Sequence, residues 1–198
     1  MLDDALIDYL IFHGREERNL EYKRTISWGD LETKVKVTQA AMAMANISGG
    51  GYIVIGVTKK GETYIPDGMQ KDNLDSFNQD DVMTWVNKYA DPYVELTVVS
   101  AERDNKNFVI IAIMEFDQLP IVCKKDGQDL KRGDLFTRSR GRYETVRVSS
   151  QNEMREIIEL AVDKEIMRLH RRGYAITAET IHPIQDDRRL FEQQGKGL

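Results

Sequence analysis

The chain has 198 residues, 41% of them hydrophobic and 31% charged, which fits a soluble globular protein of one domain, with or without an appendage. No apolar run reaches the length of about 18 residues that a transmembrane helix needs, so we expect no membrane-spanning segment and no membrane partner. The acidic N-terminus lacks the basic segment of a signal peptide, and Cys123 is the only cysteine, so we expect a cytoplasmic protein without disulfides.

The formal net charge of −5 argues against a protein that is basic overall and binds nucleic acid over its whole surface. The distribution of charge is more informative. Residues 124–147 contain eight Lys or Arg and four Asp or Glu, a local charge of +4, so the rest of the chain carries −9. The sequence is therefore acidic with one basic segment, and nucleic-acid binding is to be sought there.

The first half of the chain predicts two helices, two strands and a hairpin. A short helix covers residues 3–13, and a strand follows with Leu20 and Tyr22 on one face. A helix over residues 31–47 has a small, apolar interior, QAAMAMANIS, and should be buried on several sides. The run YIVIGV at residues 52–57 predicts a central strand covered on both faces, and the KKGE that follows predicts a hairpin.

The second half predicts a helix over residues 79–88 and strands over residues 93–101 and 108–116, joined by a polar turn. A further strand pair is expected at residues 120–123 and 135–139. A long amphipathic helix over residues 150–172 should begin at a capping box of Ser150 and Glu153 and pack on the domain. Its predicted apolar stripe consists of Met154, Ile157, Ile158, Ala161, Ile166 and Leu169. Residues 173–198 are polar and predicted to form an irregular tail.

Strands and helices that do not alternate regularly indicate an α+β fold, here a single mixed sheet flanked by helices. The domain organisation that we predict has four parts: an N-terminal helix at residues 1–14, the main domain at 15–149, the C-terminal helix at 150–172 and the tail at 173–198.

Three consecutive glycines, Gly49, Gly50 and Gly51, separate the second helix from the central strand. Glycine accepts the left-handed conformation that ends a helix, and it lets two backbones approach closely, so one interpretation is a packing junction. The other interpretation is that backbone N–H groups of the glycines bind an anion such as phosphate. The junction is not a Walker loop, because no G-x-x-x-x-G-K-[ST] occurs and the helix precedes the glycines.

The segments EERNLEYKRT, AMANISGGGYIVIGV and GDLFTRSRGRYETV, in this order and spacing, resemble the Schlafen AlbA-like domain. The resemblance spans residues 16–148. Its most specific parts are Glu21-Tyr22-Lys23, Ala45-Asn46 with Gly49 and Gly50, Ile55-Gly56-Val57, and Arg138. It implies an α+β fold and a role in nucleic-acid binding or RNA cleavage, while bacterial relatives are also described as divergent ATP-binding domains.

For nuclease-competent Schlafens the resemblance implies three acidic residues that bind a divalent metal, Mg²⁺ or Mn²⁺, and cut RNA. The first two fall on Glu16 and Glu21, but the third position is Lys59, with Glu62 just beyond it. A lysine has the wrong sign for a metal ligand, because such ions need oxygen donors. The other interpretation is that Glu21 pairs with Lys23 or with an arginine of the basic segment.

The segment LFTRSRGRYE places Arg138, Arg140 and Arg142 at alternating positions. A regular strand would put all three guanidinium groups on one face, where they could bind phosphates bidentately. Lys131 and Arg132 on the preceding turn, and Lys23, complete the predicted set of nucleic-acid-binding residues. Tyr143 is a candidate for stacking on bases.

The leading prediction is a nucleic-acid-binding module that contacts RNA or DNA phosphates through this basic strand, without a required cofactor. The first alternative is a metal-dependent endoribonuclease that uses Glu16, Glu21 and Glu62. The second is a nucleotide-binding regulatory domain in which Asn46, Gly49, Gly50, Gly51 and Gly56 form a structural or phosphate-binding loop. A homo-oligomer and fusion to a larger effector protein are both compatible with the sequence.

Overall fold

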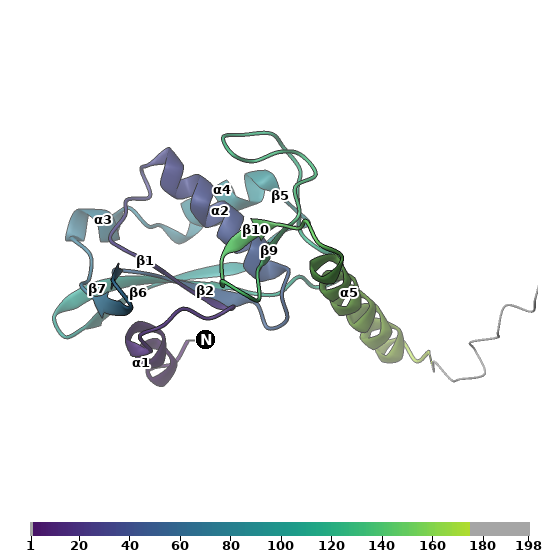
Figure 1. Cartoon of the computed structure of the whole chain (residues 1–198), viewed down its shortest axis with the longest axis horizontal. Helices are drawn as coiled ribbons and strands as arrows, with labels where there is room; N and C mark the ends of the chain where they lie inside the picture. The colour runs from purple at the N-terminus through teal and green to yellow at the C-terminus, as the bar shows by residue number, and fades with distance from the viewer. Residues whose placement is uncertain (1, 175–198) are drawn as a thin grey trace, which may run out of the picture. The chain divides into compact units, whose positions relative to one another are not determined.

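The computed structural model describes residues 2–174 (Figure 1). The last residues of the predicted tail, 175–198, lie outside the described residues. The chain divides into two units after Ala161, within the last helix, and the sheet and its layers belong to the first unit.

The helices are α1 (Asp4–Phe12), α2 (Leu31–Ala45), α3 (Lys71–Asp75), α4 (Gln79–Tyr89) and α5 (Gln151–Arg171). The strands are β1 (Leu20–Lys23), β2 (Gly51–Ile55), β3 (Val57–Lys60), β4 (Thr63–Pro66), β5 (Ala90–Asp91), β6 (Leu96–Arg103), β7 (Lys106–Ile113), β8 (Val122–Cys123), β9 (Phe136–Arg138) and β10 (Thr145–Arg147).

The main sheet has four strands in the order β1-β2-β7-β6. β1 and β2 are parallel, with Leu20 opposite Tyr52 and Lys23 opposite Ile55, and α2 forms the crossover between them. The other two pairings are antiparallel. The predicted α+β fold with a mixed sheet and a long C-terminal helix is therefore confirmed.

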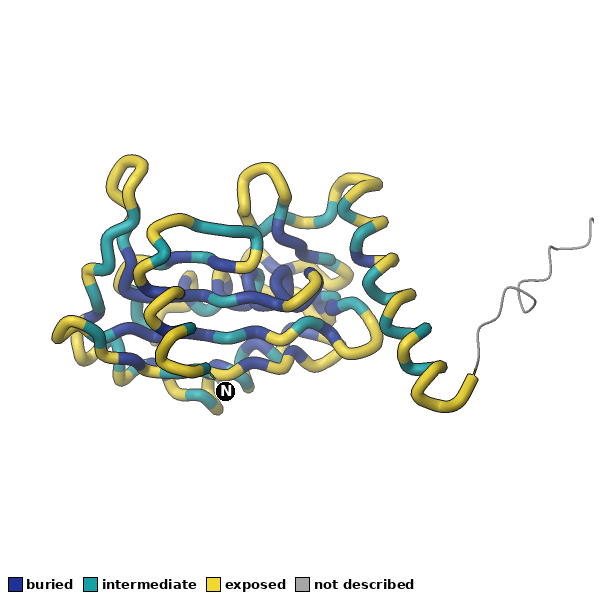
Figure 2. The backbone as a smooth tube through the Cα atoms, turned by 90° about the horizontal axis from the view of Figure 1, so that it is seen from below, coloured by how far each residue is buried: buried dark blue, intermediate teal, exposed yellow. Residues whose placement is uncertain are grey.

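The strand β2 is covered on both faces, because its side chains alternate between two apolar clusters. Ile53 and Ile55 pack with α2 and α4, whereas Val54 packs with α1. Figure 1 shows α2 and α4 above the sheet and α1 below it. Figure 2 shows that the central strands are mostly buried and that exposed residues concentrate in the turns. The sequence prediction of a central strand covered on both faces is correct for β2.

The predicted strand over residues 52–57 is too long. β2 ends at Ile55, and β3 begins at Val57 as part of a separate hairpin with β4. Gly56 lies between them with a φ of +110°, and a Cβ at this position would lie 2.8 Å from the Phe108 ring. A left-handed backbone and close packing against Phe108 thus break the run that reads as one strand in the sequence.

The predicted pairing of residues 120–123 with 135–139 is also wrong, apart from one bridge between Val122 and Leu135. β8 pairs with β5, and β9 pairs with β10. β5 and β10 have two and three residues, too few to show a pattern in the sequence. The short helix α3 was not predicted for the same reason.

The start of α5 has the predicted capping box. The Ser150 hydroxyl accepts from the Glu153 N–H, and the Glu153 carboxylate accepts from the Ser150 N–H, each at 3.3 Å. The predicted apolar stripe does not pack as a whole. In the first unit Ile157 is buried and Ala161 packs against the core, whereas Met154 and Ile158 are exposed. None of the helices in the described range, residues 2–174, is long and apolar enough to cross a bilayer.

Gly50 lies at the closest backbone contact of the junction between α2 and β2. Its φ is +68°, and a Cβ would lie 2.1 Å from the carbonyl oxygen of Ile113 in β7. Only glycine satisfies both conditions without moving the backbone.

We expect Gly50→Ala to lower the free energy of unfolding by about 1–3 kcal/mol from the strained φ, with a further cost from the overlap with Ile113. Gly141→Ala is the matched control, because Gly141 has no atoms within 4 Å of a Cβ and no positive φ. Thermal and urea unfolding of both variants would measure the difference, and equal melting temperatures would contradict this account of the junction.

Candidate nucleic-acid interface

A cluster of charged side chains joins β1 to β9. The Glu21 carboxylate binds Lys23 Nζ through Oε1 at 2.5 Å and the Arg138 guanidinium through Oε2. The sequence leaves two partners open for Glu21, Lys23 or an arginine of the basic segment. In the structure Glu21 binds both. The three side chains are 2–17% exposed, so the cluster is largely removed from water.

Arg138 is a buried residue in the centre of this cluster. Its Nε donates to the carbonyl of Arg18 at 3.1 Å, and Nη1 donates to Thr145 Oγ1 at 3.3 Å as well as to Glu21. Burial lowers the pKa of Arg138, while the charge of Glu21 opposes this shift. A buried guanidinium with these partners holds the β9–β10 hairpin against β1, and it is not a surface contact for phosphate.

The expected row of three arginines on one face is therefore wrong. β9 ends at Arg138, and residues 139–143 form a turn in which Tyr143 has a φ of +54°. The alternation of a strand does not continue through this turn, so Arg140 and Arg142 do not share the buried environment of Arg138. Both are exposed.

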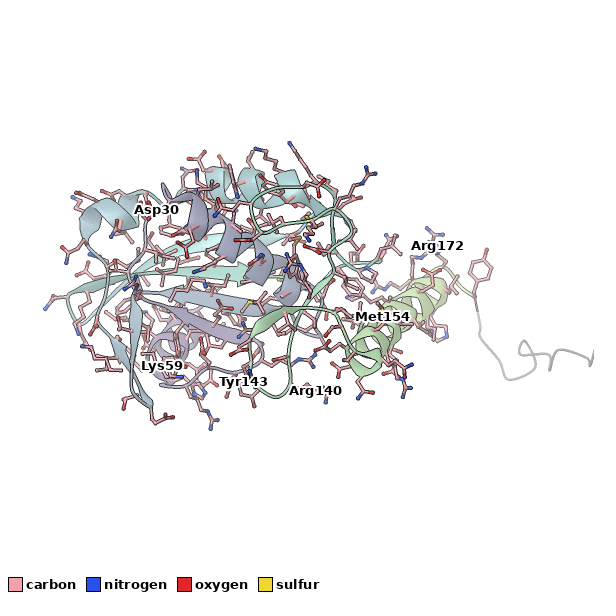
Figure 3. The ribbon with its side chains drawn as sticks, turned by 45° about the horizontal axis from the view of Figure 1, so that its top comes forward. Asp30, Lys59, Arg140, Tyr143, Met154 and Arg172 are labelled. Carbon is pink, nitrogen blue, oxygen red and sulfur yellow. The ribbon has the colours of Figure 1, made fainter. Side chains whose placement is uncertain are left out.

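The exposed turn at residues 139–143, which we call the basic turn, carries two arginines and an aromatic ring. The Arg140 side chain is 72% exposed, and Tyr143 is 42% exposed. Figure 3 shows Arg140, Tyr143 and Lys59 following one another along one edge of the molecule in that view. The basic turn thus offers cations and a stacking surface together, the combination used by proteins that bind single-stranded nucleic acid.

The structure does not place Lys131 and Arg132 with the basic turn. They lie in the loop before β9, whereas the basic turn follows β9, so the two groups are at opposite ends of the β9–β10 hairpin. Their backbone N–H groups bind the carboxylates of Asp134 and Asp126, and both residues are exposed. The sequence groups Lys131 and Arg132 with the arginines of residues 138–142 in one predicted set, and the structure separates them.

Glu16 lies in a second group of polar residues, near the β3–β4 hairpin. Its carboxylate accepts from the Tyr64 hydroxyl at 3.0 Å and from the Tyr22 N–H at 3.1 Å. The hydrogen bond with Tyr64 and the nearby charges of Glu62 and Glu16 raise the pKa of Lys59, whose ammonium lies 5.4 Å from the Tyr64 ring centre. A cavity of about 280 Å³ lies here, and its lining includes Glu16, Tyr22, Arg24, Lys59 and Tyr64.

The acidic residues that the resemblance implies do not assemble into a metal site. Glu16 binds Tyr64, Glu21 is neutralised by Lys23 and Arg138, and Glu62 is exposed in the β3–β4 turn. Among the residues that the structure describes, no group of three or more His, Cys, Asp or Glu side chains is placed to hold a metal ion. A hard divalent cation needs about six oxygen ligands, and this donor set does not fit one.

The N–H groups of Gly49 and Gly50 are bound by the protein itself. The Gly49 N–H donates to the Glu115 carboxylate at 2.7 Å, and the Gly50 N–H donates to the carbonyl of Ile47 at 3.1 Å. Asn46 is buried and bonds through its side chain to the backbone of Ile121 and Phe136. Gly51 begins β2, and a Cβ at this position would lie 2.8 Å from the carbonyl oxygen of Asn19. These contacts favour the packing interpretation of the junction over phosphate binding.

Two residues near the basic turn were not found by sequence reasoning. Arg18 donates through Nε to the carbonyl of Arg138 and binds Glu156 through Nη2 at 2.5 Å. Glu156 also binds Arg140 Nε at 2.6 Å. Arg18 and Glu156 are 138 positions apart, and no local pattern indicates a contact over that distance.

The model of a protein family described as "Schlafen, AlbA_2" matches residues 16–156. A solved structure of the DIP2311 protein from Corynebacterium diphtheriae is similar in fold, with a TM-score of 0.50 and 14% sequence identity. The similarity covers 77% of this chain but only 27% of the DIP2311 chain. The N-terminal domain of a protein related to the ATP-dependent DNA helicase RecG, from Nitrosomonas europaea, gives a TM-score of 0.46 at 23% identity. That match covers 72% of this chain and 89% of the domain. A comparison with curated proteins found no significant match.

The Arg138–Glu21 pair allows a direct test of its structural role. We expect Glu21→Ala to lower the free energy of unfolding by about 3–5 kcal/mol, because it leaves the buried Arg138 charge without a counter-ion. Glu62→Ala removes the same charge from an exposed turn and should change stability by less than about 0.5 kcal/mol. Urea unfolding would measure both free energies, provided that the slope m is the same for all variants. A change near zero in Glu21→Ala would show that Arg138 does not need Glu21 as its counter-ion.

Proposed function

The chain belongs to the Schlafen AlbA_2 family, and on that premise we propose that it is a nucleic-acid-binding module that contacts backbone phosphates through its basic turn. The observation that carries the proposal is the exposure of Arg140 and Arg142 beside Tyr143, in a protein that is otherwise acidic. Arginine binds phosphate oxygens through its planar fork, and an exposed tyrosine ring stacks on bases of any sequence.

The position of the basic turn suits this role, because its base is held by buried and backbone contacts while its arginines remain exposed. Arg138 is fixed by Glu21 at the end of β9, and the backbone of Ser139 pairs with Glu144 at 2.9 Å across the turn. Residues 140–143 therefore extend from a hairpin whose base is held in place. Contacts presented from a rigid support lose less conformational entropy on binding. RNA and DNA share the backbone phosphates, so the module is proposed to bind single strands of either.

A pair of double variants tests the surface. Arg140→Ala with Arg142→Ala should weaken binding of a labelled single-stranded RNA and reduce the slope of log K against log salt by about 1.4, since two phosphate contacts are lost at roughly 0.7 each. Lys131→Ala with Arg132→Ala removes the same charge from the other end of the hairpin and should leave the slope nearly unchanged. Fluorescence anisotropy over a range of salt concentrations gives both values. Equal losses in the two variants would refute a localised surface at the basic turn.

The alternative of a metal-dependent endoribonuclease has less support, because Lys59 lies where an acid is needed and Glu21 is already neutralised. We expect the protein to leave RNA intact with Mn²⁺ or Mg²⁺ at concentrations where it binds the RNA. Incubation of labelled tRNA and single-stranded RNA with and without EDTA, followed on denaturing gels, checks this. Mn²⁺-dependent cleavage that Glu16→Gln abolishes would replace the binding module with the nuclease.

A further inference from the structure

Two arginines from distant parts of the chain converge on one carboxylate beside the basic turn. Arg18 Nη2 lies 2.5 Å from Glu156 Oε2, and Arg140 Nε lies 2.6 Å from Glu156 Oε1. Glu156 is in the first turns of α5 and belongs to the same unit as both arginines. The side chains of Arg18 and Glu156 are about one quarter exposed, so the site is open to solvent on one side.

We propose that Arg18 and Arg140 form a clamp for one backbone phosphate of a nucleic acid, and that Glu156 occupies this clamp in the free protein. This inference rests on the proposed function and adds to it a binding residue, Arg18, and a competing group, Glu156. A carboxylate and a phosphate present oxygen pairs that arginine forks bind with the same geometry. Two guanidinium groups around one carboxylate therefore mark a position where a phosphate oxygen also fits.

The orientation of Arg18 is set before any ligand binds. Its Nε donates to the carbonyl of Arg138 at 2.9 Å, and Arg138 Nε donates back to the carbonyl of Arg18 at 3.1 Å. Arg138 is itself fixed by Glu21. This chain of contacts aims the free edge of the Arg18 guanidinium at the position that Glu156 occupies. Binding there costs little side-chain entropy, which distinguishes Arg18 from a freely moving surface arginine.

Glu156 and a phosphate cannot share the clamp, because both are anions and both need the same N–H donors. Binding of nucleic acid must displace the carboxylate, and the affinity measured for the protein includes that cost. The Glu156 carboxylate also links the start of α5 to the β9–β10 hairpin. The next residue, Ile157, is the buried residue of α5. The Glu156 contact thus couples the binding surface to the first turns of α5, within the first unit.

The test compares Glu156→Gln with Glu159→Gln. Each removes one negative charge from α5, and Gln and Glu have similar helix propensities. Glu159 is exposed and takes no part in the clamp. We expect Glu156→Gln to tighten binding of a labelled single-stranded RNA about fivefold, which corresponds to roughly 1 kcal/mol at 1.4 kcal/mol per factor of ten. Glu159→Gln should stay within about twofold of the unmodified protein, since only long-range charge changes.

A third variant separates the clamp from a general effect of charge. Arg18→Ala in the Glu156→Gln background should remove the gain in affinity, and melting temperatures of all variants check that they fold. If the unmodified protein binds RNA and the two glutamine variants bind equally, the clamp is wrong and the proposed function stands. A lower melting temperature of Glu156→Gln without tighter binding would also overturn the clamp, because it assigns Glu156 a structural role only. If no variant binds RNA or DNA, the proposed function and the clamp both fail.

Discussion

The buried charge of Arg138 is the constraint on which the placement of the basic segment depends. Burying a guanidinium costs free energy unless a carboxylate and hydrogen-bond acceptors surround it. Glu21, Thr145 and the carbonyls of residues 17 and 18 supply these partners. They come from β1, the loop before it and β10, so they meet only when the β9–β10 hairpin is docked against this edge of the sheet. The ion pair therefore fixes the hairpin and the direction in which the basic turn projects.

Because Arg138 is buried, the three arginines at alternating positions, Arg138, Arg140 and Arg142, lie in different environments. Arg138 is neutralised inside the protein, Arg140 is held by a single carboxylate at the surface, and Arg142 is exposed. Lys23 shares the Glu21 carboxylate with Arg138, which leaves it less available to an external anion. The local charge of +4 that the sequence carries thus overstates what the surface offers to a polyanion. The charge that reaches solvent is concentrated at the basic turn and at the separate loop that contains Lys131 and Arg132.

The sequence was most informative where one local pattern determines the structure. The buried interior of α2 and the capping box of α5 were both predicted, because the first follows from a run of small and apolar residues and the second from two residues within one helical turn. The break at Gly56 and the pairing of β8 with β5 depend on contacts with Phe108 and with the end of α4, which are remote in sequence. The burial of Arg138 was missed for a related reason. Alternation within a strand indicates which side chains share a face, but it does not indicate where the strand ends or what covers that face.

The proposed binding of a polyanion to an acidic protein requires that carboxylates near the binding surface be paired with cations. Around the basic turn, Glu21 is paired with Arg138 and Glu156 is paired with Arg18 and Arg140. These two ion-paired groups differ in how far their arginines are exposed to water. A phosphate in solution cannot reach Arg138 without unfolding the hairpin, since that side chain is 2% exposed, whereas the 72% exposed Arg140 remains hydrated and open to competition. The gradient of burial across these contacts therefore separates an ion pair that builds the fold from the one that we propose a ligand exchanges, although the residue types are the same.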